Sequence, residues 1–478
     1  MNNNRIMINI IVAVDKNFGI GKDNKLPWSI SEELKLFKKK TNDSILIVGR
    51  KTFEKLPKLK NRIVFCISRK FNITYENNDC IVIFQSIDEA IEQAKKLNKT
   101  IFIIGGNQIY NYVFKNYRNE LLVHISFLKE EYICDTFFDI NNLKNFYIIQ
   151  KNDYELFNHY EMKYQKYGEQ QYLDLIKDIL ENGERRKTRN AETISDFCKH
   201  LKFDLRDGFP LLTTKKMFLK GIIEELLFFI RGDTNSKILE EKGINIWKGN
   251  TSREFLDANG FKDRKEGEMG PMYGNIWRNF NSLSSEKDLQ DSKYTKFFYR
   301  TYKDNMSYFD GEVDSINFNI DQLKFVINEI KTNPTSRRIL MTTFNPSQVI
   351  QGVLWPCHSI TIQFYVQDGF LDMFCYCRSQ DIALGTGFNI ASSSLLLMII
   401  SQITKLIPRY MNMTIGDAHI YSEHAEPIKM QLERIPYTFP TLILPEFETL
   451  EEVEKLNFND FKLENYQYYP TIKMLMIA

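Results

Sequence analysis

The first part of the chain alternates short β-branched runs with amphipathic stretches, and this alternation restricts the fold more than any other feature. The apolar runs IMINIIVAV, ILIV, RIVFCIS, CIVIF, IFII and LLVHISF have the length and composition of buried strands. The stretches SEELKLFKKK, SIDEAIEQAKKL and NQIYNYVFK have helical spacing and lie between some of these runs. Alternating strand and helix units form a largely parallel sheet with helices on its faces, so we expect an α/β domain.

This pattern changes near residue 167. YELFNHYEMKYQKY, residues 154–167, alternates apolar and polar positions and predicts a closing strand. EQQYLDLIKDILENG, residues 169–183, predicts a helix that ends at Gly183. A chain of 478 residues is too long for one hydrophobic core. We therefore expect two domains, residues 1–166 and residues 167–478, with almost no linker between them.

The second part of the chain predicts an α+β domain. Its long helical stretches are LKGIIEELLFFI and ASSSLLLMIISQITKL, and its extended runs include ITIQFYVQDG and LDMFCYC. These elements favour a mixed or antiparallel sheet. Residues 281–312 are polar, charged and poor in aliphatic side chains, so we expect them to form a surface insertion.

Composition excludes several classes of protein. Apolar residues make up 43% of the chain and charged residues 26%, which is typical of a globular protein. The net charge of +2 gives no overall field for nucleic acid or a membrane surface. No apolar run reaches membrane-spanning length, and the sequence MNNNRIMINI lacks the features of a signal peptide. We expect a cytoplasmic enzyme that acts on small molecules.

The seven cysteines are scattered and odd in number, which favours free thiols in a reducing compartment. The closest pair is Cys375 and Cys377, in a run that predicts a strand. Two cysteines at this spacing, without two further ligands, are a poor signal for zinc. We therefore predict no metal.

The stretch GIGKDNKLPWSISEELKLF places a carboxylate on an apolar helix stripe. Ser29 and Glu32 fit a capping box, which predicts that a helix starts here. Glu33 then shares a face with Leu34 and Phe37. Glu33 is either a residue at the edge of the stripe that reaches solvent, or a buried carboxylate that hydrogen-bonds a cationic or amidine-like heterocycle.

Two strand ends predict phosphate-binding turns. ILIVGRKT and IFIIGGNQ both run from a strand through glycine into a helix, where backbone N–H groups and a helix N-terminus attract anions. ISRK, residues 67–70, ends another strand with a hydroxyl and two cations. By charge, that combination suits the extra phosphate of NADP.

These motifs together resemble dihydrofolate reductase over the first domain. The resemblance rests on LPW-x4-E, VGRKTFE, the SRK strand end, IIGGNQIY and DTFF. It implies that Glu33 is the catalytic carboxylate that binds the pterin. The folate pocket would be lined by Ala13, Ile20, Phe37 and Leu59, with Arg62 on the α-carboxylate of the substrate's glutamate. NADPH would be held by Arg50, Thr52, Ser68, Arg69, Gly105, Gly106 and Tyr110.

One position departs from the reductase pattern. The family usually has a threonine before the basic residue of LTHI-like strands, and its hydroxyl bonds the catalytic carboxylate. This chain has Val123 there, in LLVHISF. The substitution bears on the reaction rate more than on the assignment of Glu33.

In the second domain, LWPCHS contains Cys357 between two strand-like runs. A lone cysteine beside proline and histidine is most often structural, whereas a nucleophilic one needs a stabilised thiolate and a nearby cation. SRRI supplies Arg337 and Arg338, and CRSQD supplies Arg378 and Ser379. Three arginines and a serine also suit a phosphate clamp.

The helix LKGIIEELLFFI carries a second carboxylate on an apolar stripe. Glu225 shares a face with Ile222 and Phe229, so we expect it to be buried with a raised pKa and to manage protons through water. Glu224 lies one turn from Lys220, and we expect those two residues to form an exposed pair.

Ordered motifs along the second domain resemble thymidylate synthase. They are DGFPLLTTK, ELLFFIRGDTN, IWKGN-x3-EFLD, GPMYG-x2-W, NPTSRRI, LWPCH, RSQD-x2-LG, FNIASS, GDAHIYSEH and YPTIKMLMIA. The resemblance implies that Cys357 attacks C6 of the uracil ring of dUMP. C5 then attacks the methylene group of 5,10-methylenetetrahydrofolate, and hydride transfer leaves dTMP and dihydrofolate.

The resemblance also implies roles for individual residues. The catalytic group would be completed by Glu225, Tyr273 and His358. The folate-binding group would contain Trp247, Asn250 and Asp381. The residues that bind dUMP would be Arg189, Arg337, Arg338, Arg378, Ser379, Asn389, His419 and Tyr421. Arg337 and Arg338 would come from a partner subunit, so a homodimer through the second domain is expected.

Two positions depart from the synthase pattern. Cys377 stands where the family usually has the glutamine before Arg-Ser, whose side chain touches the nucleophile and nearby water. Asn190 stands where the family has the threonine after the arginine.

Both resemblances in one chain match the fused enzymes of protists and plants, in which the reductase regenerates the folate that the synthase oxidises. Two alternatives remain at this point. One is a binding or regulatory module that keeps the folds but has lost the chemistry. The other is an active synthase with a weak reductase.

Overall fold

The computed structural model describes residues 7–57, 59–69, 81–188, 191–280, 320–346, 348–475 and 477. The chain forms two compact units. Unit 1 contains residues 1–170 and 435–438, and unit 2 contains residues 171–434 and 439–478. The surface insertion predicted at residues 281–312 lies outside the described residues.

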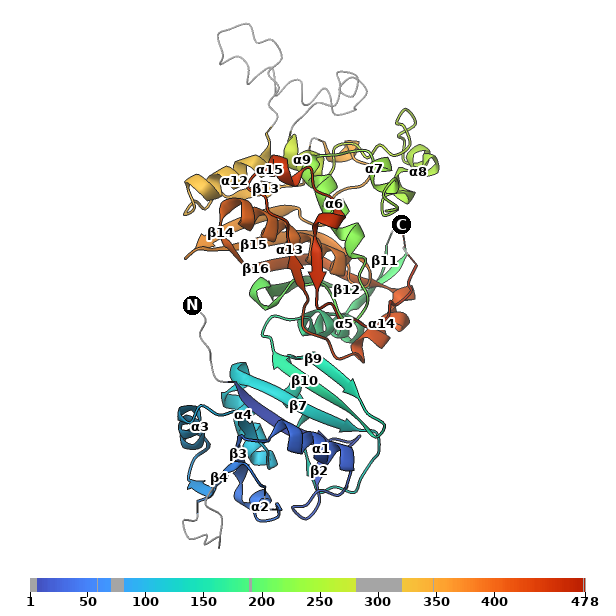
Figure 1. Ribbon diagram of the computed structural model, residues 1–478. Coiled ribbons are helices and arrows are strands. Elements are labelled where there is room, and N and C mark those ends of the chain that lie inside the picture. The colour runs from blue at the N-terminus through green and yellow to red at the C-terminus, as the bar shows by residue number, and fades with distance from the viewer. Residues whose placement is uncertain are drawn as a thin grey trace. The chain divides into compact units, whose positions relative to one another are not determined.

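Unit 1 is built on an eight-stranded sheet (Figure 1). In spatial order its strands are β5 (Ile81–Phe84), β4 (Ile63–Ile67), β3 (Ile45–Gly49), β6 (Ile101–Ile103), β1 (Ile8–Val14), β7 (Leu121–Leu128), β10 (Phe157–Tyr164) and β9 (Phe146–Asp153). The pairings from β5 to β7 are parallel. Beyond β7, strands β10 and β9 extend the sheet with antiparallel pairings. The predicted α/β domain with a mostly parallel sheet is confirmed.

The shorter elements of unit 1 connect these strands. The helices are α1 (Ser31–Lys40), α2 (Arg50–Phe53), α3 (Ile87–Lys96) and α4 (Asn107–Asn116), with 3-10 turns η1 (Arg118–Glu120) and η2 (Ile140–Leu143). β2 (Gly19–Gly21) pairs with β8 (Thr136–Phe137). Residues 435–438 add to the β9 edge, where the Ile148 N–H donates to the Pro436 carbonyl at 3.0 Å.

The start of α1 differs from the prediction. The helix begins at Ser31, and Ile30 before it is extended, with φ −101° and ψ 108°. Because the chain is still extended at Ile30, Ser29 lies outside the first turn. The predicted capping box of Ser29 and Glu32 is therefore wrong, and among the described residues no side chain caps the start of this helix.

Unit 2 contains a six-stranded mixed sheet, which confirms the α+β prediction. In spatial order its strands are β11 (Glu184–Lys187), β12 (Glu192–Asp204), β16 (Ile407–Tyr421), β15 (Phe370–Asp381), β14 (Thr361–Gln367) and β13 (Leu340–Thr342). Only β15 and β16 pair in parallel, and the other neighbours are antiparallel. A small second sheet pairs β17 (Thr441–Ile443) with β18 (Lys462–Glu464).

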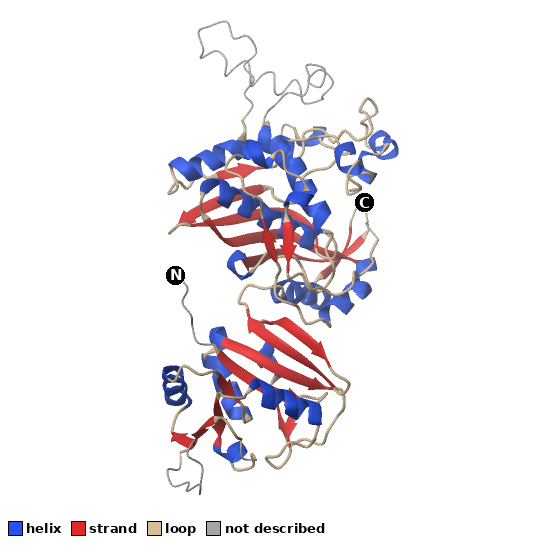
Figure 2. Ribbon diagram, in the orientation of Figure 1, coloured by secondary structure: helices blue, strands red, loops and turns tan. Residues whose placement is uncertain are grey.

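The helices of unit 2 pack around this sheet (Figure 2). They are α5 (Gln170–Asn182), α6 (Leu219–Arg231), α7 (Lys237–Glu240), α8 (Arg253–Ala258), α9 (Gly274–Arg278), α12 (Gln322–Thr332), α13 (Gly385–Thr404), α14 (Ala425–Leu432) and α15 (Leu450–Val453). The 3-10 turns are η3 (Leu205–Asp207), η4 (Gly249–Thr251), η5 (Val349–Gln351), η6 (Ser422–His424) and η7 (Phe458–Asp460).

Helix α13 connects the parallel strands β15 and β16. Within the described part of the chain, it is the one helix with the length and hydropathy of a membrane span. Of its most apolar window, 78% is buried inside the unit. An apolar helix in that position serves as a core element, because a crossover between parallel strands must pack on a sheet face.

Candidate active sites

Unit 1 contains a cavity of about 1690 Å³. It opens where the carboxyl ends of β3, β4 and β6 meet the starts of α2 and α4, which is the usual ligand site of a parallel sheet. The structure brings all the reductase residues predicted from the sequence to the lining of this one cavity: Ala13, Ile20, Glu33, Phe37, Arg50, Thr52, Leu59, Arg62, Ser68, Arg69, Gly105, Gly106 and Tyr110.

Glu33 is the buried carboxylate of this cavity. It is 6% exposed, and burial raises its pKa to about 7. Within the described part of the chain, no protein group donates a hydrogen bond to its carboxylate. Val123 is fully buried in β7, where it pairs with Ile10 of β1, and it offers no hydroxyl. Glu33 is therefore held by packing. Because its pKa is about 7, the protonated and ionised forms of its carboxyl group are similarly populated at neutral pH.

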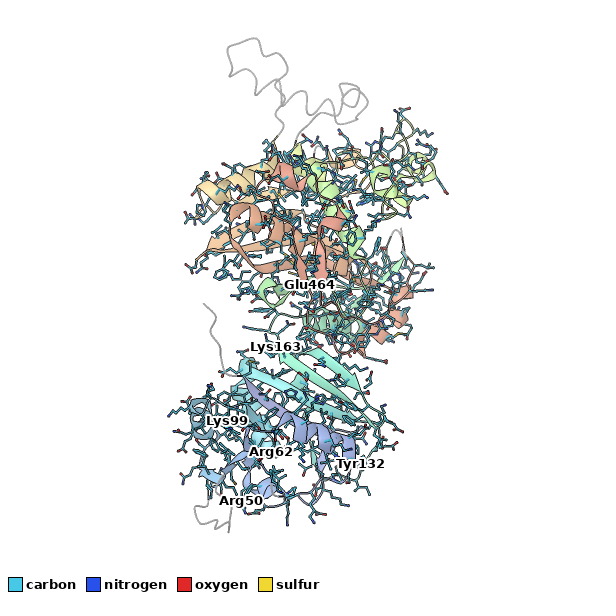
Figure 3. All side chains as sticks on the ribbon, viewed as in Figure 1. Arg50, Arg62, Lys99, Tyr132, Lys163 and Glu464 are labelled. Carbon is cyan, nitrogen blue, oxygen red and sulfur yellow. The ribbon has the colours of Figure 1, made fainter. Side chains whose placement is uncertain are left out.

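Hydrogen bonds to the surrounding backbone fix Arg62, which is labelled in Figure 3. Its Nε donates to the carbonyl and the hydroxyl of Thr41 at 3.2 and 3.1 Å. Its Nη1 donates to the Lys60 carbonyl at 2.8 Å and its Nη2 to the Lys38 carbonyl at 2.9 Å. Burial lowers its pKa slightly without removing the charge. The cavity therefore has one immobile cation in its wall.

The two predicted strand–glycine–helix turns face each other. The Gly49 N–H donates to the Gly105 carbonyl at 2.8 Å, and a Cβ added to Gly106 would lie 2.9 Å from the Thr52 hydroxyl. A side chain at residue 106 would therefore force the Thr52 hydroxyl to move. α2 and α4 begin directly after the two turns, at Arg50 and at residue 107, so their first N–H groups lie at the cavity.

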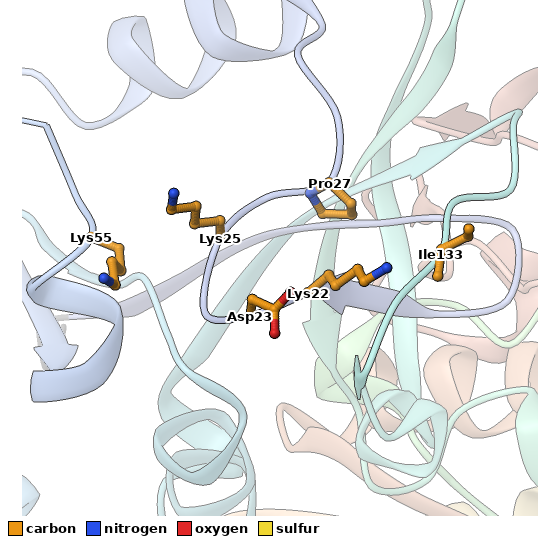
Figure 4. A pocket seen from close by; sticks show the side chains of 6 residues that line it. All are labelled: Lys22, Asp23, Lys25, Pro27, Lys55 and Ile133. Carbon is orange, nitrogen blue, oxygen red and sulfur yellow. The ribbon is translucent and has the colours of Figure 1, made fainter.

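A smaller hollow of about 670 Å³ adjoins the main cavity (Figure 4). It is lined by Lys22, Asp23, Lys25, Pro27, Lys55 and Ile133. Lys25 and Lys55 line both hollows, so the smaller one is an outer part of the same site. Three lysines against one aspartate give this outer part a positive potential, which attracts anionic ligands.

In unit 2, Cys357 lies in direct contact with Tyr273. The Cys357 N–H donates to the Tyr273 hydroxyl at 3.1 Å, and that hydroxyl lies 3.5 Å from the Cys357 sulfur. The Tyr273 ring stacks on the ring of His358 at 4.5 Å. Three of the predicted catalytic residues therefore form one contiguous group.

Tyr273 is held in a strained conformation. Its φ is 36°, which is rare for a residue with a side chain. A Cβ added to Gly274 would lie 2.1 Å from the Phe229 carbonyl oxygen, so α9 can only begin this close to α6 with glycine. The approach of the two helices sets the position of the tyrosine hydroxyl.

The loop of Cys357 is anchored by Arg378. The Nε of Arg378 donates to the Pro356 carbonyl at 2.8 Å and its Nη2 to the Trp355 carbonyl at 3.0 Å. The Ser379 N–H donates to the Cys357 carbonyl at 3.4 Å. Burial raises the pKa of the Cys357 thiol, and the opposing effects of Tyr273 and Arg378 are smaller. The sulfur is therefore held as a thiol, whereas nucleophilic attack needs the thiolate.

Glu225 connects to this group through Trp247. The Trp247 Nε1–H donates to the Glu225 carboxylate at 2.8 Å, and the Trp247 ring lies 5.9 Å from the ring of Tyr273. Burial raises the pKa of Glu225 to about 7, and the hydrogen bond from Trp247 opposes this only in part. A chain of contacts thus runs from Glu225 through Trp247 and Tyr273 to Cys357.

The predicted exposed pair of Glu224 and Lys220 is wrong. Glu224 is 2% exposed, and its carboxylate lies 2.5 Å from Lys242 and accepts the Phe458 N–H at 2.8 Å. The Lys220 ammonium donates instead to the carbonyl of Lys242. The prediction fails because α6 is packed on all sides of its middle turns, so neither glutamate reaches solvent.

Sequence reasoning missed Gln380 as a partner of Asn389. Asn389 Nδ2 donates to Gln380 Oε1 at 2.9 Å, and the Thr386 hydroxyl donates to the same oxygen at 3.1 Å. Gln380 is 3% exposed. Strand alternation gave no signal, because Gln380 has the parity of the exposed Arg378 and not that of the buried Cys375 and Cys377.

Cys377 is fully buried on the same strand as Cys375, and both are free thiols. The pKa of Cys377 is lowered, first by a hydrogen bond from Cys375. Cys377 in turn raises the pKa of Cys357, so the two sulfurs interact. The residue that departs from the family pattern is therefore close enough to affect the nucleophile.

The remaining predicted residues lie as follows. Asn250 is buried beside the Trp247 turn. Asp381 Oδ1 accepts the N–H groups of residues 383 and 384 at 2.9 and 3.1 Å. The ring of His419 lies 5.3 Å from the ring of Tyr421 on β16. Arg337 and Arg338 are exposed before β13, and Arg189 lies outside the described residues.

Two family models match the chain, Dihydrofolate reductase over residues 7–169 and Thymidylate synthase over residues 170–478. The chain belongs to the bifunctional dihydrofolate reductase–thymidylate synthase family. It is 35% identical to the bifunctional dihydrofolate reductase-thymidylate synthase of Paramecium tetraurelia, over 98% of each chain. It is 36% identical to form 2 from Arabidopsis thaliana, over 98% of this chain and 88% of that one. It is 34% identical to the enzyme of Leishmania major, over 98% of this chain and 94% of that one.

The chain is therefore an enzyme with two activities, which confirms the functional prediction. The reductase uses NADPH to convert dihydrofolate to tetrahydrofolate. The synthase methylates dUMP to dTMP with 5,10-methylenetetrahydrofolate and releases dihydrofolate. The second activity supplies the substrate of the first.

Proposed function

We propose that the large cavity of unit 1 is the reductase site and that the Cys357 group of unit 2 is the synthase site, with residues 1–166 and 167–478 as the two functional domains. The observation that carries the first assignment is the convergence of all the predicted reductase residues on one cavity. The second rests on the contacts that join Glu225, Trp247, Tyr273 and Cys357.

In the reductase site, Glu33 holds the pterin and keeps a proton available near neutral pH. Its pKa of about 7 supports this role, because a group that titrates at the working pH can both accept and release a proton. Ala13, Ile20, Phe37 and Leu59 provide apolar contacts to the folate, and Arg62 binds the carboxylate of its glutamate.

The rest of the cavity suits NADPH. The first N–H groups of α2 and α4 bind its phosphates, and Thr52, Gly105, Gly106 and Tyr110 shape the wall around it. Ser68, Arg69 and Arg50 supply a hydroxyl and two cations for the additional phosphate. When bound, NADPH supplies the hydride, and the protein orients it and excludes water.

In the synthase site, Cys357 forms a covalent bond to C6 of dUMP. Its thiol must first lose a proton, and Tyr273 and Arg378 are the groups that stabilise the thiolate. Glu225 manages protons through water, with Trp247 fixing its carboxylate and His358 stacked on Tyr273.

The nucleotide and folate contacts follow the same assignment. Asn389 reads the pyrimidine, and a polar mismatch there leaves buried groups unpaired. His419 and Tyr421 bind the ribose, and Asn250 and Asp381 contact the folate. The phosphate of dUMP is bound by Arg189, Arg378, Ser379 and, from a second subunit, Arg337 and Arg338.

We further propose that the protein is a cytoplasmic homodimer that pairs through unit 2. The exposure of Arg337 and Arg338 supports this arrangement, because it leaves both guanidinium groups available to the nucleotide phosphate of a second copy. Mixing Cys357→Ser with Arg337→Ala tests it. Each variant alone is inactive as a synthase, and a mixed dimer regains one intact site. No recovery on mixing contradicts the shared site.

Two separate assays test the site assignments. NADPH oxidation with dihydrofolate is measured beside dTMP formation, in wild type, Glu33→Ala and Cys357→Ser. We expect Glu33→Ala to lose only the reductase activity and Cys357→Ser only the synthase activity. The assignment would be contradicted if either folded variant lost both activities or kept both.

A further inference from the structure

A buried cluster in unit 1 lies outside the residues that line the cavity. His124 and Ser126 of β7 pair with Glu161 and His159 of β10, so these four side chains share one face of the sheet. One nitrogen from each histidine and one Glu161 oxygen lie within 4.8 Å of one another. His124 is 5% exposed and His159 is fully buried.

The second nitrogen of each imidazole is already oriented. Asn9 Nδ2 donates to the Ile101 carbonyl at 3.1 Å, so its Oδ1 is left to accept from His124 Nε2, also at 3.1 Å. His124 Nε2 therefore carries the ring proton, and Nδ1 keeps its lone pair. His159 Nδ1 is bound to the Ser126 hydroxyl at 3.1 Å. Metal-binding histidines have this kind of support on their other nitrogen.

The two nitrogens that face the cluster lack donors. Both His124 Nδ1 and His159 Nε2 are buried, and neither has a hydrogen-bond partner among the residues that the structure describes. The nearest carboxylate oxygen to His124 Nδ1 is Glu161 Oε1, at 3.8 Å. Lone pairs of a neutral imidazole and a carboxylate that face each other without a proton between them repel, and a cation between them would remove this repulsion.

Lys40 partly fills this need. Its ammonium lies 2.6 Å from Glu161 Oε1 and reaches the cluster from the last turn of α1. It satisfies the carboxylate but neither imidazole nitrogen, because both remain unpartnered. The side chains of Lys40 and Glu161 are 19% and 20% exposed, so the cluster opens to solvent on their side.

We propose that His124, His159 and Glu161 form a site for a zinc-class divalent cation, which replaces the Lys40 ammonium on Glu161. Two imidazoles and one carboxylate are a ligand set that Zn²⁺ accepts, with water in the fourth position. Tetrahedral ligands of zinc lie about 3.4 Å apart, so the partly exposed Glu161 must move inward. The metal would tie β7 to β10 beside the antiparallel edge of the sheet.

Titration of the full-length protein with Co²⁺, a spectroscopic substitute for Zn²⁺, tests the proposal. We expect visible absorption typical of nitrogen and oxygen ligands, without the near-ultraviolet band of a thiolate ligand, and its displacement by one equivalent of Zn²⁺. Glu161→Gln removes a ligand and should abolish this signal. Lys40→Met removes the competing cation and should tighten binding at least about tenfold, the scale on which neighbouring groups affect metal sites.

Lys39→Met and Glu155→Gln are matched controls, because both residues are exposed and lie close in sequence to the varied ones. Circular dichroism checks that each variant is folded, and His159→Gln replaces Glu161→Gln if the latter unfolds. A signal that survives in both ligand variants, a thiolate band in its place, or unchanged affinity in Lys40→Met would overturn the proposal.

Discussion

Replacing Glu225 by glutamine should make unit 2 more stable at alkaline pH while it stops the synthase. The carboxylate of Glu225 is buried in α6 with one hydrogen bond, from Trp247. Glutamine has nearly the same shape and its Oε1 can still accept that bond. It differs from the carboxylate only in being neutral at every pH.

The size of the effect follows from the pKa of Glu225. Burial raises it from 4.5 to about 7, so the folded protein holds this proton more tightly than the unfolded chain does. The contribution of this bound proton to the free energy of unfolding is complete below pH 4.5 and is lost as the pH rises through 7. The difference between 7 and 4.5, at 1.36 kcal/mol for each pH unit, is about 3 kcal/mol. Glu225→Gln avoids this loss.

Urea unfolding between pH 5 and pH 9 measures the difference. Tryptophan fluorescence follows mainly unit 2, which contains Trp247, Trp277 and Trp355, whereas unit 1 contains only Trp28. We expect the variant to exceed wild type by less than about 1 kcal/mol at pH 5 and by up to about 3 kcal/mol above pH 8. Glu241→Gln, on an exposed residue of the same unit, should show no such trend. A variant that is no more stable than wild type at pH 9 would refute the reasoning.

Three further predictions concern the synthase unit. Gly274→Ala should destabilise unit 2 by about 3 kcal/mol, because its Cβ would overlap the Phe229 carbonyl; a change in the urea midpoint under 0.5 M would argue against this contact. Gln380→Ala should raise KM for dUMP about tenfold while the reductase rate stays unchanged, because Asn389 loses the group that orients its amide; Gln380→Glu, which keeps the accepting oxygen, should recover part of the loss. Alkylation of Cys357 by iodoacetamide without nucleotide should accelerate as the pH rises beyond 9, because burial raises the pKa of this thiol; a rate that is already constant at pH 7 would show a thiolate instead.

The sequence predicts the architecture well where local pattern and tertiary environment agree. The strand and helix runs of unit 1 and the core helices α6 and α13 lie where periodicity places them, because each buries one continuous apolar surface. The start of α1 was mispredicted because a capping box describes local hydrogen bonds, whereas the entry of the chain at Ile30 depends on tertiary packing.

The site residues divide in the same way. Motif spacing identifies side chains that line the cavity of unit 1, and several of them, such as Arg50, Ser68 and Gly105, follow strand ends that meet at one sheet edge. It does not identify Gln380 or the Lys242 partner of Glu224, which are separated from their neighbours by turns of the chain. The raised pKa of Cys357 also depends on burial in three dimensions, which no sequence motif encodes.

The fixation of Arg62 has a consequence for ligand design. A guanidinium carries five N–H groups, and the bonds to Thr41, Lys60 and Lys38 use three of them. One N–H remains on each terminal nitrogen, which is the pair that a carboxylate engages in two parallel bonds. Because the protein has already immobilised this side chain, an incoming ligand avoids an ordering cost of about 1 kcal/mol. Inhibitors with a terminal carboxylate should therefore bind several-fold more tightly than their amide analogues, even when the acid group adds no new apolar contact.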